Sequence, residues 1–471
     1  MGVNRNIVTM TIWRPAMRHG LPRYLAIAEA LADDVAAARL TAGTQLPTHR
    51  DLADRLGVTV GTVSRAYAEA SRRGLISGEV GRGTFVRNAV GGEPGIASDD
   101  LEGGLVDLGV NHPPPIDGEE VAALQATMRA FARRRDLGSL LAYPPDAGAR
   151  AHREAGAVWL ARGGHTVDAG RIVVCSGSQH GLVALLSMLA REGEEVLVES
   201  LTYAGLKAIA GLLRLRLHPV AIDAEGVVPG ALDEACRATA ARILYCVPTV
   251  QNPTAAVMSN ARRAAIAEIV ARRGLTVIED DVHGRLADEP PPPLAALVPE
   301  RTYYVTSTSK TIAPGLRVGF VAAPPGMADR LAATVRVTTW GAAPLPAEVA
   351  AAWIHDGTAE ALLKARRREA AARQSIAAGA LAGLGLRATA GAYHVWIELP
   401  SPWRSATFAA EARQRGVAVT PSEAFAVGGG ETPAAVRLCL GTPRTRESLQ
   451  RGLRAVRQAL ESRPETAFAI V

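Results

Sequence analysis

Hydrophobic residues near the start of the chain repeat at the three- and four-residue spacing of an α-helix. Tyr24, Leu31 and Val35 lie on one such face, which predicts a first helix between residues 21 and 40. Glycine and proline then interrupt the pattern. The run Thr48-His49-Arg50-Asp51 has the form of a capping box and predicts the start of a second, short helix.

A third helix and a hairpin follow. Gly57 predicts a turn, and Thr59 can cap a helix that runs to Arg73. Short β segments at residues 75–76 and 84–86 are separated by a glycine-rich stretch, which predicts two paired strands. Helices joined by a tight turn and followed by a basic wing are typical of a winged helix-turn-helix.

Charge favours a nucleic-acid partner for this region. Residues 1–90 hold 12 arginines and 7 acidic residues, a net charge of +5, whereas the remaining 381 residues hold 40 basic and 39 acidic residues. Such an asymmetry favours binding to a polyanion, here double-stranded DNA with the third helix in the major groove. A three-helix protein-interaction domain is the alternative. The candidate DNA-binding residues are Arg50, Thr59, Thr62, Arg65, Arg82 and Gly83.

The rest of the chain has an α/β pattern. Apolar runs alternate with helical patterns, which predicts a mostly parallel sheet with helices on both faces. The preceding stretch is rich in Gly, Asp, Glu and Ser and has no periodicity, which predicts a flexible tether. We expect a DNA-binding domain at 1–87, a linker at 88–105 and an α/β domain at 106–471.

Five predicted strands each lead into a polar or aromatic residue. In chain order these residues are Ser178 with Gln179, then Tyr203, Asn252, Asp280 and Lys310. Sites in open α/β sheets form at the carboxyl ends of strands, so we expect these side chains to share one site. A glycine loop before Ser178 leads into a helix and is a natural anion site.

Lys310 gives the clearest chemical signal. It is one of only three lysines beside 49 arginines, and it follows an apolar strand in the run Ser307-Thr308-Ser309-Lys310, with Arg317 seven residues on. The amine can form an imine with an aldehyde, while hydroxyls and a guanidinium group can hold a phosphate. An aldehyde cofactor with a phosphate suits this pattern, although a lone SxSK run also suits a solvated surface lysine.

Both halves resemble known families. The stretches at 46–53, 57–67 and 80–86 resemble the GntR family of bacterial repressors. Many members have an arginine just after the residue that opens the recognition helix, where this chain has Val60-Gly61. Base reading must then depend more on Arg65, Thr62, Arg50 and the wing, so the operator sequence does not carry over.

From about Val106 onward, the order of strand-end residues resembles fold-type I aminotransferases. The resemblance implies a smaller C-terminal α+β subdomain and pyridoxal 5'-phosphate bound as an internal aldimine at Lys310. Implied roles are phosphate binding by Ser178, Gln179, Ser307 and Arg317, ring stacking by Tyr203, a hydrogen bond to the ring oxygen from Asn252, and pairing of Asp280 with the ring nitrogen. Tyr143 would reach the phosphate of a neighbouring subunit, implying a homodimer, and Arg437 would bind an effector carboxylate.

One departure affects the cofactor site directly. Family members usually have a tyrosine two or three residues after the aspartate, where this chain has His283. The imidazole can still donate a hydrogen bond to the cofactor oxygen, but we expect its protonation to change near neutral pH. Efficient transamination is therefore less certain than cofactor binding. Ala255 replaces the glycine usual after Asn-Pro-Thr, a minor packing change.

Together the halves resemble the MocR subfamily, which implies a DNA-binding transcriptional regulator that senses an amino compound or the cofactor itself. The alternative is a working aminotransferase with a secondary DNA-binding module; a scaffold without cofactor is a third reading. The four scattered cysteines have no metal-ligand spacing, and no apolar run is long enough for a bilayer. We therefore expect a cytoplasmic protein without a metal.

Overall fold

The computed structural model divides the 471-residue chain into two compact units, Met1–Gly95 and Ile96–Val471. It describes residues 13, 15, 22–36, 39–40, 44–72, 75–79, 83–86, 104–116, 118–287, 289–430 and 432–462. Within these ranges, no helix is both long and apolar enough to cross a membrane. Most of the predicted linker lies outside the described residues.

The first unit has the predicted winged helix-turn-helix. Its elements are α1 (Arg23–Ala36), β1 (Gln45–Leu46), α2 (His49–Leu56), α3 (Val60–Arg72), β2 (Ile76–Glu79) and β3 (Gly83–Val86). The predicted capping box is confirmed, because the Thr48 side chain accepts a hydrogen bond from the Asp51 amide at 3.2 Å. Gly57 ends α2 with a φ of 61°, a left-handed conformation that glycine adopts without a steric cost.

The wing is larger than predicted. Strands β2 and β3 pair from Ile76 opposite Val86 to Glu79 opposite Gly83, and β1 adds a third strand against β3. Buried side chains from all three helices and the sheet form one core that includes Leu31, Leu52 and Val63. Arg82, a predicted DNA-binding residue, lies outside the described residues.

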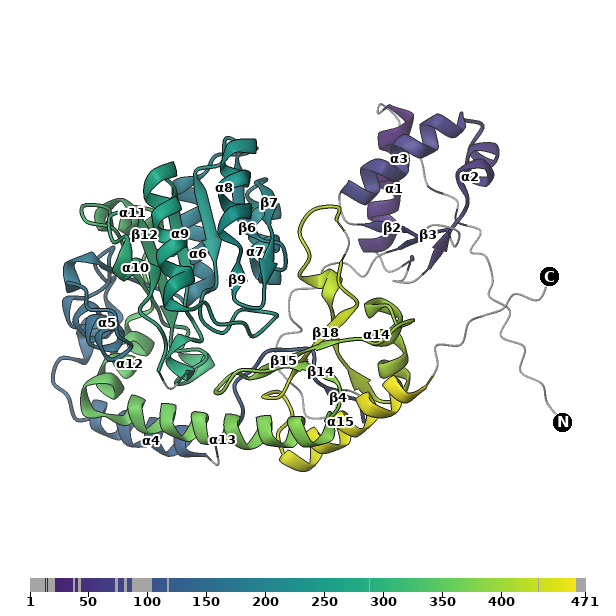
Figure 1. Ribbon diagram of the computed structural model, residues 1–471. Coiled ribbons are helices and arrows are strands. Elements are labelled where there is room, and N and C mark those ends of the chain that lie inside the picture. Colours follow the sequence, from purple (N-terminus) through teal and green to yellow (C-terminus); the bar gives the residue numbers. More distant parts are fainter. Residues whose placement is uncertain are drawn as a thin grey trace. The chain divides into compact units, whose positions relative to one another are not determined.

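A seven-stranded sheet forms the centre of the second unit (Figure 1). Its strands, in spatial order, are β5 (Ile172–Cys175), β13 (Gly319–Ala322), β12 (Thr302–Ser307), β11 (Thr276–Asp280), β10 (Ile243–Cys246), β6 (Glu195–Glu199) and β7 (Arg216–Val220). Only β13 runs against its neighbours, so the predicted mostly parallel sheet is confirmed. The carboxyl ends of β5, β6, β10, β11 and β12 therefore share one edge.

Helices cover both faces of this sheet (Figure 1). Successive residues of a strand point to opposite faces, and in β6 Val196 and Val198 join one core cluster whereas Leu197 joins another. One face packs against α6 (Ser178–Leu189), α7 (Ala204–Leu212) and α11 (Ala328–Thr339). The other face packs against α5 (Arg150–Arg162), α8 (Pro229–Ala238), α9 (Asn260–Arg273) and α12 (Pro344–Asp356).

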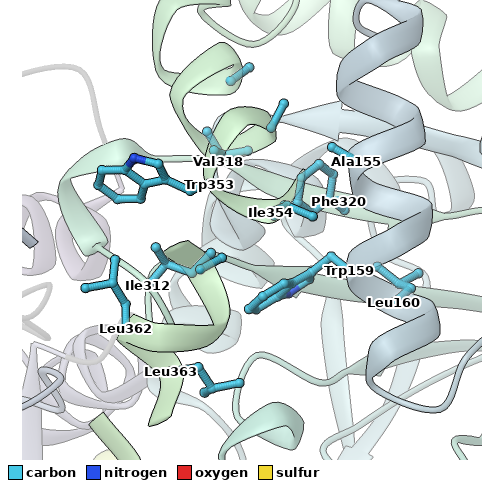
Figure 2. Packing of buried hydrophobic residues seen from close by; sticks show 14 of the residues in the cluster. Ala155, Trp159, Leu160, Ile312, Val318, Phe320, Trp353, Ile354, Leu362 and Leu363 are labelled. Atoms are coloured by element: carbon cyan, nitrogen blue, oxygen red, sulfur yellow. The ribbon is translucent and has the colours of Figure 1, made fainter. Parts of the chain in front are cut away.

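The core on the α5 and α12 side also holds the chain that carries Lys310. Figure 2 shows Ile312 and Val318 among Trp159, Phe320 and Trp353. Ile312 follows the lysine and Val318 begins the return to β13, and both are essentially fully buried. Because the two ends of this loop are packed into the core, Lys310 is presented from a rigid frame.

A smaller α+β part completes the second unit, as the resemblance implied. Its sheet has the order β14 (Gly385–Arg387), β15 (His394–Glu398), β18 (Ala435–Cys439) and β17 (Thr420–Pro421). The long helix α13 (Thr358–Ala380) extends along it and packs against α15 (Arg446–Glu461) (Figure 1). The amino-terminal strand β4 (Val106–Asp107) pairs with β16 (Val417–Ala418), so the first residues after the linker belong to this part.

Candidate functional site

Lys310 lies at the carboxyl edge of the central sheet, three residues after β12. Its backbone oxygen accepts a hydrogen bond from the Tyr393 hydroxyl at 2.7 Å, and Arg366 donates to the nearby Ile312 oxygen at 2.9 Å. The Lys310 Nζ atom donates to the backbone oxygen of Asn111. The amine therefore points into the protein rather than out to solvent.

A cradle for an anion lies beside this loop. Gly177 has a φ of 86° and precedes the first turn of α6, where backbone N–H groups face outward. A Cβ atom at Gly177 would lie 2.8 Å from the Arg317 guanidinium group, which also contacts the Ser309 hydroxyl at 3.5 Å. Glycine, helix terminus and guanidinium thus converge on one point, an arrangement that suits a phosphate.

The predicted phosphate residues differ in their exposure. Ser178 opens α6 and is half-buried, as is Gln179, whose side-chain oxygen accepts from the Tyr203 hydroxyl at 3.0 Å. Ser307 is fully buried, and its hydroxyl accepts from the Ser309 amide at 3.3 Å. Ser309, which was not among the predicted phosphate residues, accepts a hydrogen bond from Arg317 Nη1 at 3.5 Å.

Asp280 ends β11 and is buried. Its Oδ2 accepts from the Tyr245 hydroxyl at 2.8 Å, whereas Oδ1 has no hydrogen-bond partner among the described residues. Burial raises the pKa of Asp280 to about 6, against the lowering effect of the Tyr245 hydroxyl. At neutral pH this carboxylate is charged and has one oxygen available for a cationic nitrogen.

Arg437 and Asn252 join the two parts of the second unit. Arg437 in β18 donates from Nη1 to the Asn252 side-chain oxygen at 2.7 Å and from Nη2 to the Gly109 backbone oxygen at 2.6 Å. Its guanidinium carbon lies 4.7 Å from the centre of the Phe425 ring. The buried Nε has no partner within the described part of the chain.

His283 belongs to a buried polar cluster. The Asn111 side-chain nitrogen lies 3.4 Å from both the His283 and the His394 ring, and His394 also contacts the Gln251 backbone oxygen at 3.0 Å. Burial, together with the charge of Lys310, holds the pKa of His283 well below its usual range. The expected change of protonation near neutral pH is therefore wrong: the imidazole stays neutral because a buried cation would be poorly solvated.

A second buried network lies behind this cluster. The Glu199 side chain accepts from Gln251 at 3.2 Å and from the Val247 amide at 3.3 Å, and burial raises its pKa to about 8. Arg263 and Glu279, both essentially inaccessible to solvent, form an ion pair at 3.5 Å. These contacts fix the backbone behind the strand ends that carry Asn252 and Asp280.

Sequence reasoning missed four residues that contact this site. Tyr245 was visible only as one more apolar member of its strand. His394 begins a buried strand far along the chain, and Gly109 and Asn111 lie in a stretch without helical or strand periodicity. The contacts of Asn111 with His283 and His394 span 172 and 283 residues, so no local pattern could indicate them.

Tyr143 lies on an exposed apolar surface of the second unit. Its side chain is 81% exposed and its ring lies 5.1 Å from that of Trp340, beside Leu141, which is 90% exposed. These residues border a pocket of about 410 Å³ that Ser176, next to the anion cradle, also lines.

The predicted DNA-binding residues that the structure describes lie on α2, on and just before α3, and at the start of β3 in the first unit. Thr59 caps this helix by accepting from the Thr62 amide at 3.2 Å, and the two hydroxyls lie 2.9 Å apart. Arg65 is exposed, with its guanidinium carbon 5.1 Å from the centre of the Tyr24 ring. Arg50 is exposed on α2, and Gly83 begins β3 of the wing.

The residues of the second unit fit pyridoxal phosphate. Asp280 Oδ1 suits a protonated ring nitrogen, the cradle of Gly177 and Arg317 suits the phosphate, and the Lys310 amine points inward from the same edge of the sheet. Burial raises the pKa of Asp280, and the charge of Lys310 lowers it, which is consistent with a shared site. These side chains fit the chemistry of the cofactor.

Comparisons with known proteins agree with both halves. Residues 104–456 match the family of class I and II aminotransferases, and residues 23–86 match the gntR family of bacterial regulatory proteins. YdeF of Bacillus subtilis, an uncharacterized HTH-type transcriptional regulator, is 30% identical over 95% of this chain and 97% of its own. The vitamin B6 salvage pathway transcriptional repressor PtsJ of Salmonella typhimurium is 28% identical over 85% of this chain and 90% of its own.

Among solved structures, the α-aminoadipate aminotransferase LysN of Thermus thermophilus, in complex with N-(5'-phosphopyridoxyl)-L-leucine, is similar to the second unit. It is 28% identical, with a TM-score of 0.67, and the match covers 76% of this chain and 93% of that one. The family and this neighbour imply pyridoxal phosphate as the cofactor. With a gntR-type winged helix followed by a class I and II aminotransferase domain, the chain belongs to the MocR subfamily of GntR transcriptional regulators.

Proposed function

We propose that this protein is a transcriptional regulator whose second unit senses an amino compound, or pyridoxal phosphate itself, through the cofactor held at Lys310. The observation that carries the proposal is that Lys310 and Arg437 donate to backbone oxygens only two residues apart, Asn111 and Gly109, in a chain that also has a winged helix. The relative PtsJ, named for the repression of vitamin B6 salvage, supports a regulatory rather than metabolic role.

The residues of the site divide the work of holding the cofactor. Pyridoxal phosphate supplies an aldehyde that reacts with amines and a ring that withdraws electrons. Lys310 provides the amine for its covalent attachment, and Asp280 keeps a negative charge at the ring nitrogen. Arg317 and the first turn of α6 hold the phosphate, while the half-buried Tyr203 ring lies where it can cover the pyridine face.

Arg437 selects a carboxylate on the effector. Its guanidinium group is buried, is oriented by Asn252, and keeps an unpartnered Nε among the described residues. A buried arginine held in this way favours planar, bidentate recognition of a carboxylate. The effector class is therefore an amino acid rather than a simple amine.

The exposed apolar surface around Tyr143 supports a homodimer. Leu141, Tyr143, Val337 and Trp340 are large and between 55% and 90% exposed, which is unusual for a surface that stays in water. The pocket beside them is continuous with Ser176 of the cofactor loop. A second copy seated there would bring its own Tyr143 towards the phosphate cradle of its partner.

A working aminotransferase is the alternative function, supported by the near-complete cofactor site and by the likeness to LysN. The departure at His283 argues against efficient transamination, because a buried neutral imidazole replaces the usual tyrosine hydroxyl near the cofactor oxygen. Turnover with an amino acid and a keto acid distinguishes the two functions directly.

The test combines DNA protection with turnover. The holoprotein should protect a specific site in the DNA flanking its own gene, and amino acids that change its absorbance should change that protection. Lys310→Ala should lose the absorbance response and the effect of amino acids on protection, whereas Lys364→Ala, at an exposed position of α13, should keep both. Rapid transamination without specific protection of DNA would replace this proposal with the alternative.

A further inference from the structure

The segment Gly109–Asn111 contacts both residues to which the proposed function assigns ligand chemistry. The Gly109 oxygen accepts from Arg437 Nη2 at 2.6 Å, and the Asn111 oxygen accepts from Lys310 Nζ. The two carbonyls are only two residues apart. One short stretch of backbone therefore engages the carboxylate-binding arginine and the cofactor-binding lysine together.

This segment is also tied to the small sheet. The Val106 and Leu108 amides donate to the Gly416 and Ala418 oxygens, each at 2.8 Å, and the Leu108 oxygen accepts from the Cys439 amide at 2.7 Å. The Gly109 oxygen has a second donor, the Thr420 hydroxyl at 2.9 Å. The segment thus has a defined position, which depends partly on the two site residues.

Occupancy of the site changes the partners of both carbonyls. A carboxylate that binds the Nε and Nη2 groups of Arg437 brings a negative oxygen close to the Gly109 oxygen, which contacts the same Nη2 atom, and the two acceptors repel each other. Attachment of the cofactor at Lys310 reduces the number of N–H groups that Nζ offers to the Asn111 oxygen. Both events make the observed position of the segment less stable and therefore favour a displaced position.

The segment Gly109–Asn111 lies close in sequence to the chain that joins the two units. Gly104 is the first described residue after the stretch that joins the two units, and Gly109 follows it by five positions. Strand β4 is the first element of the second unit, so a displacement at Gly109 is transmitted to the end of the joining chain.

We infer that Gly109–Asn111 is the positioning segment through which occupancy of the amino-acid site is communicated to the chain leading to the DNA-binding unit. The inference rests on the proposed function for the roles of Lys310 and Arg437. An effector shifts the equilibrium between the observed and the displaced position of the segment only if its affinity for the two differs. The difference here is the repulsion between the effector carboxylate and the Gly109 oxygen, which both lie against Arg437 Nη2.

Hydrogen exchange with two matched probes tests the inference. The full-length apoprotein is loaded with N-(5'-phosphopyridoxyl)-L-alanine or with pyridoxamine 5'-phosphate, which lacks the amino-acid carboxylate. We expect the Val106 and Leu108 amides to exchange about fivefold faster with the first probe, since one hydrogen bond of the segment is lost. Amides of α9, remote from the segment in sequence, serve as the internal control.

Equal exchange of these amides with both probes, each bound, would overturn the inference and leave the proposed function intact. If neither probe binds, the proposed function fails and the inference fails with it. The two failures are therefore distinguishable.

A variant supplies a second, independent measurement. Thr420→Val removes the hydroxyl that helps to hold the Gly109 oxygen but keeps the shape of the side chain. We expect the probe with the carboxylate to bind roughly 2- to 10-fold more tightly, because the Gly109 oxygen has lost the hydrogen bond from Thr420 and is displaced more easily. Pyridoxamine phosphate should bind as before. Thr407→Val, which removes a hydroxyl bonded to the Arg404 oxygen on an exposed helix, should change neither affinity. Unchanged or weaker binding of the carboxylate probe to a folded Thr420→Val protein would contradict the inference.

Discussion

The Tyr245 hydroxyl donates a hydrogen bond to Oδ2 of Asp280 at 2.8 Å, between neighbouring strands of the central sheet. The contact leaves the other carboxylate oxygen, Oδ1, without a partner among the described residues. Burial opposes the charged carboxylate, and the Tyr245 hydroxyl is the strongest of the contacts that stabilise it. This balance decides whether Asp280 is ionised when the cofactor arrives.

Replacing Tyr245 by phenylalanine should make cofactor binding more sensitive to acid. Burial raises the pKa of Asp280 to about 6, and loss of the hydroxyl raises it further because the charged form loses its donor. We expect the pH midpoint of pyridoxal phosphate binding to rise by about one unit in Tyr245→Phe. Absorbance titrations between pH 5 and 8 measure it. Tyr303→Phe, in the neighbouring strand β12, is the control, and a midpoint shared by all three proteins would contradict the assignment.

Glu199 should make the folded protein less stable at alkaline pH. Burial raises its pKa from about 4.5 to about 8, so the folded state keeps a proton that the unfolded chain has lost. The stabilisation is complete below about pH 4.5 and is lost as the pH rises through 8. Glu199→Gln, which keeps an acceptor for Gln251, should therefore raise the melting temperature at pH 9 by on the order of 2–5 °C and change it little at pH 5.

Thermal unfolding followed by circular dichroism at both pH values checks this prediction. Glu268→Gln, at an exposed position of α9, provides the matched control and should show no such difference. If Glu199→Gln raised the melting temperature equally at pH 5 and pH 9, ionisation of the Glu199 carboxyl would not be the cause of the increase.

Arg437→Lys should reduce the preference for amino acids over simple amines. A lysine ammonium cannot reproduce the fork that contacts Asn252 and Gly109 together, and it binds a carboxylate without the bidentate geometry. We expect the ratio of affinities for L-alanine and ethylamine, measured from the absorbance of the holoprotein, to fall by roughly 10- to 100-fold. Arg330→Lys, exposed on α11, should keep the parent ratio. A ratio that survives in Arg437→Lys would place carboxylate recognition elsewhere.

Arg65→Ala should weaken DNA binding without changing the cofactor site. The side chain is exposed on α3, the helix expected in the major groove, and lies in the first unit. Loss of one base contact costs about 1–3 kcal/mol, or roughly 5- to 150-fold in affinity. Footprint titrations and absorbance spectra of the same preparations check both parts. Arg413→Ala removes an exposed charge from α14 (Ser405–Gln414) and should leave the footprint as it is. An unchanged footprint in Arg65→Ala would place the reading surface away from α3.

The sequence was most informative where local patterns coincide with chemistry. The strands β10, β11 and β12, which lead into Asn252, Asp280 and Lys310, were predicted because buried parallel strands are continuous in hydrophobicity. Strands β7 and β13 were missed. The first is a partly exposed edge strand that contains His218 and Pro219, and the second is short and enclosed by glycine and alanine.

The contacts that shape the site were less predictable. Candidate residues at strand ends followed from topology, but their partners come from segments far away in the chain. Asn111 and Gly109 lie between the linker and the first helix of the second unit, just before three consecutive prolines, where the sequence has no helical or strand pattern. The neutral state of His283 also depends on burial, which the sequence around it does not show.

The most direct test of the account is the site of covalent attachment. The holoprotein is reduced with borohydride, digested, and analysed by mass spectrometry for the phosphopyridoxyl group on each of the three lysines. We expect the adduct on the peptide that contains Lys310 and its absence from Lys310→Ala. An adduct on Lys207 or Lys364, or no adduct on any lysine, would contradict the account.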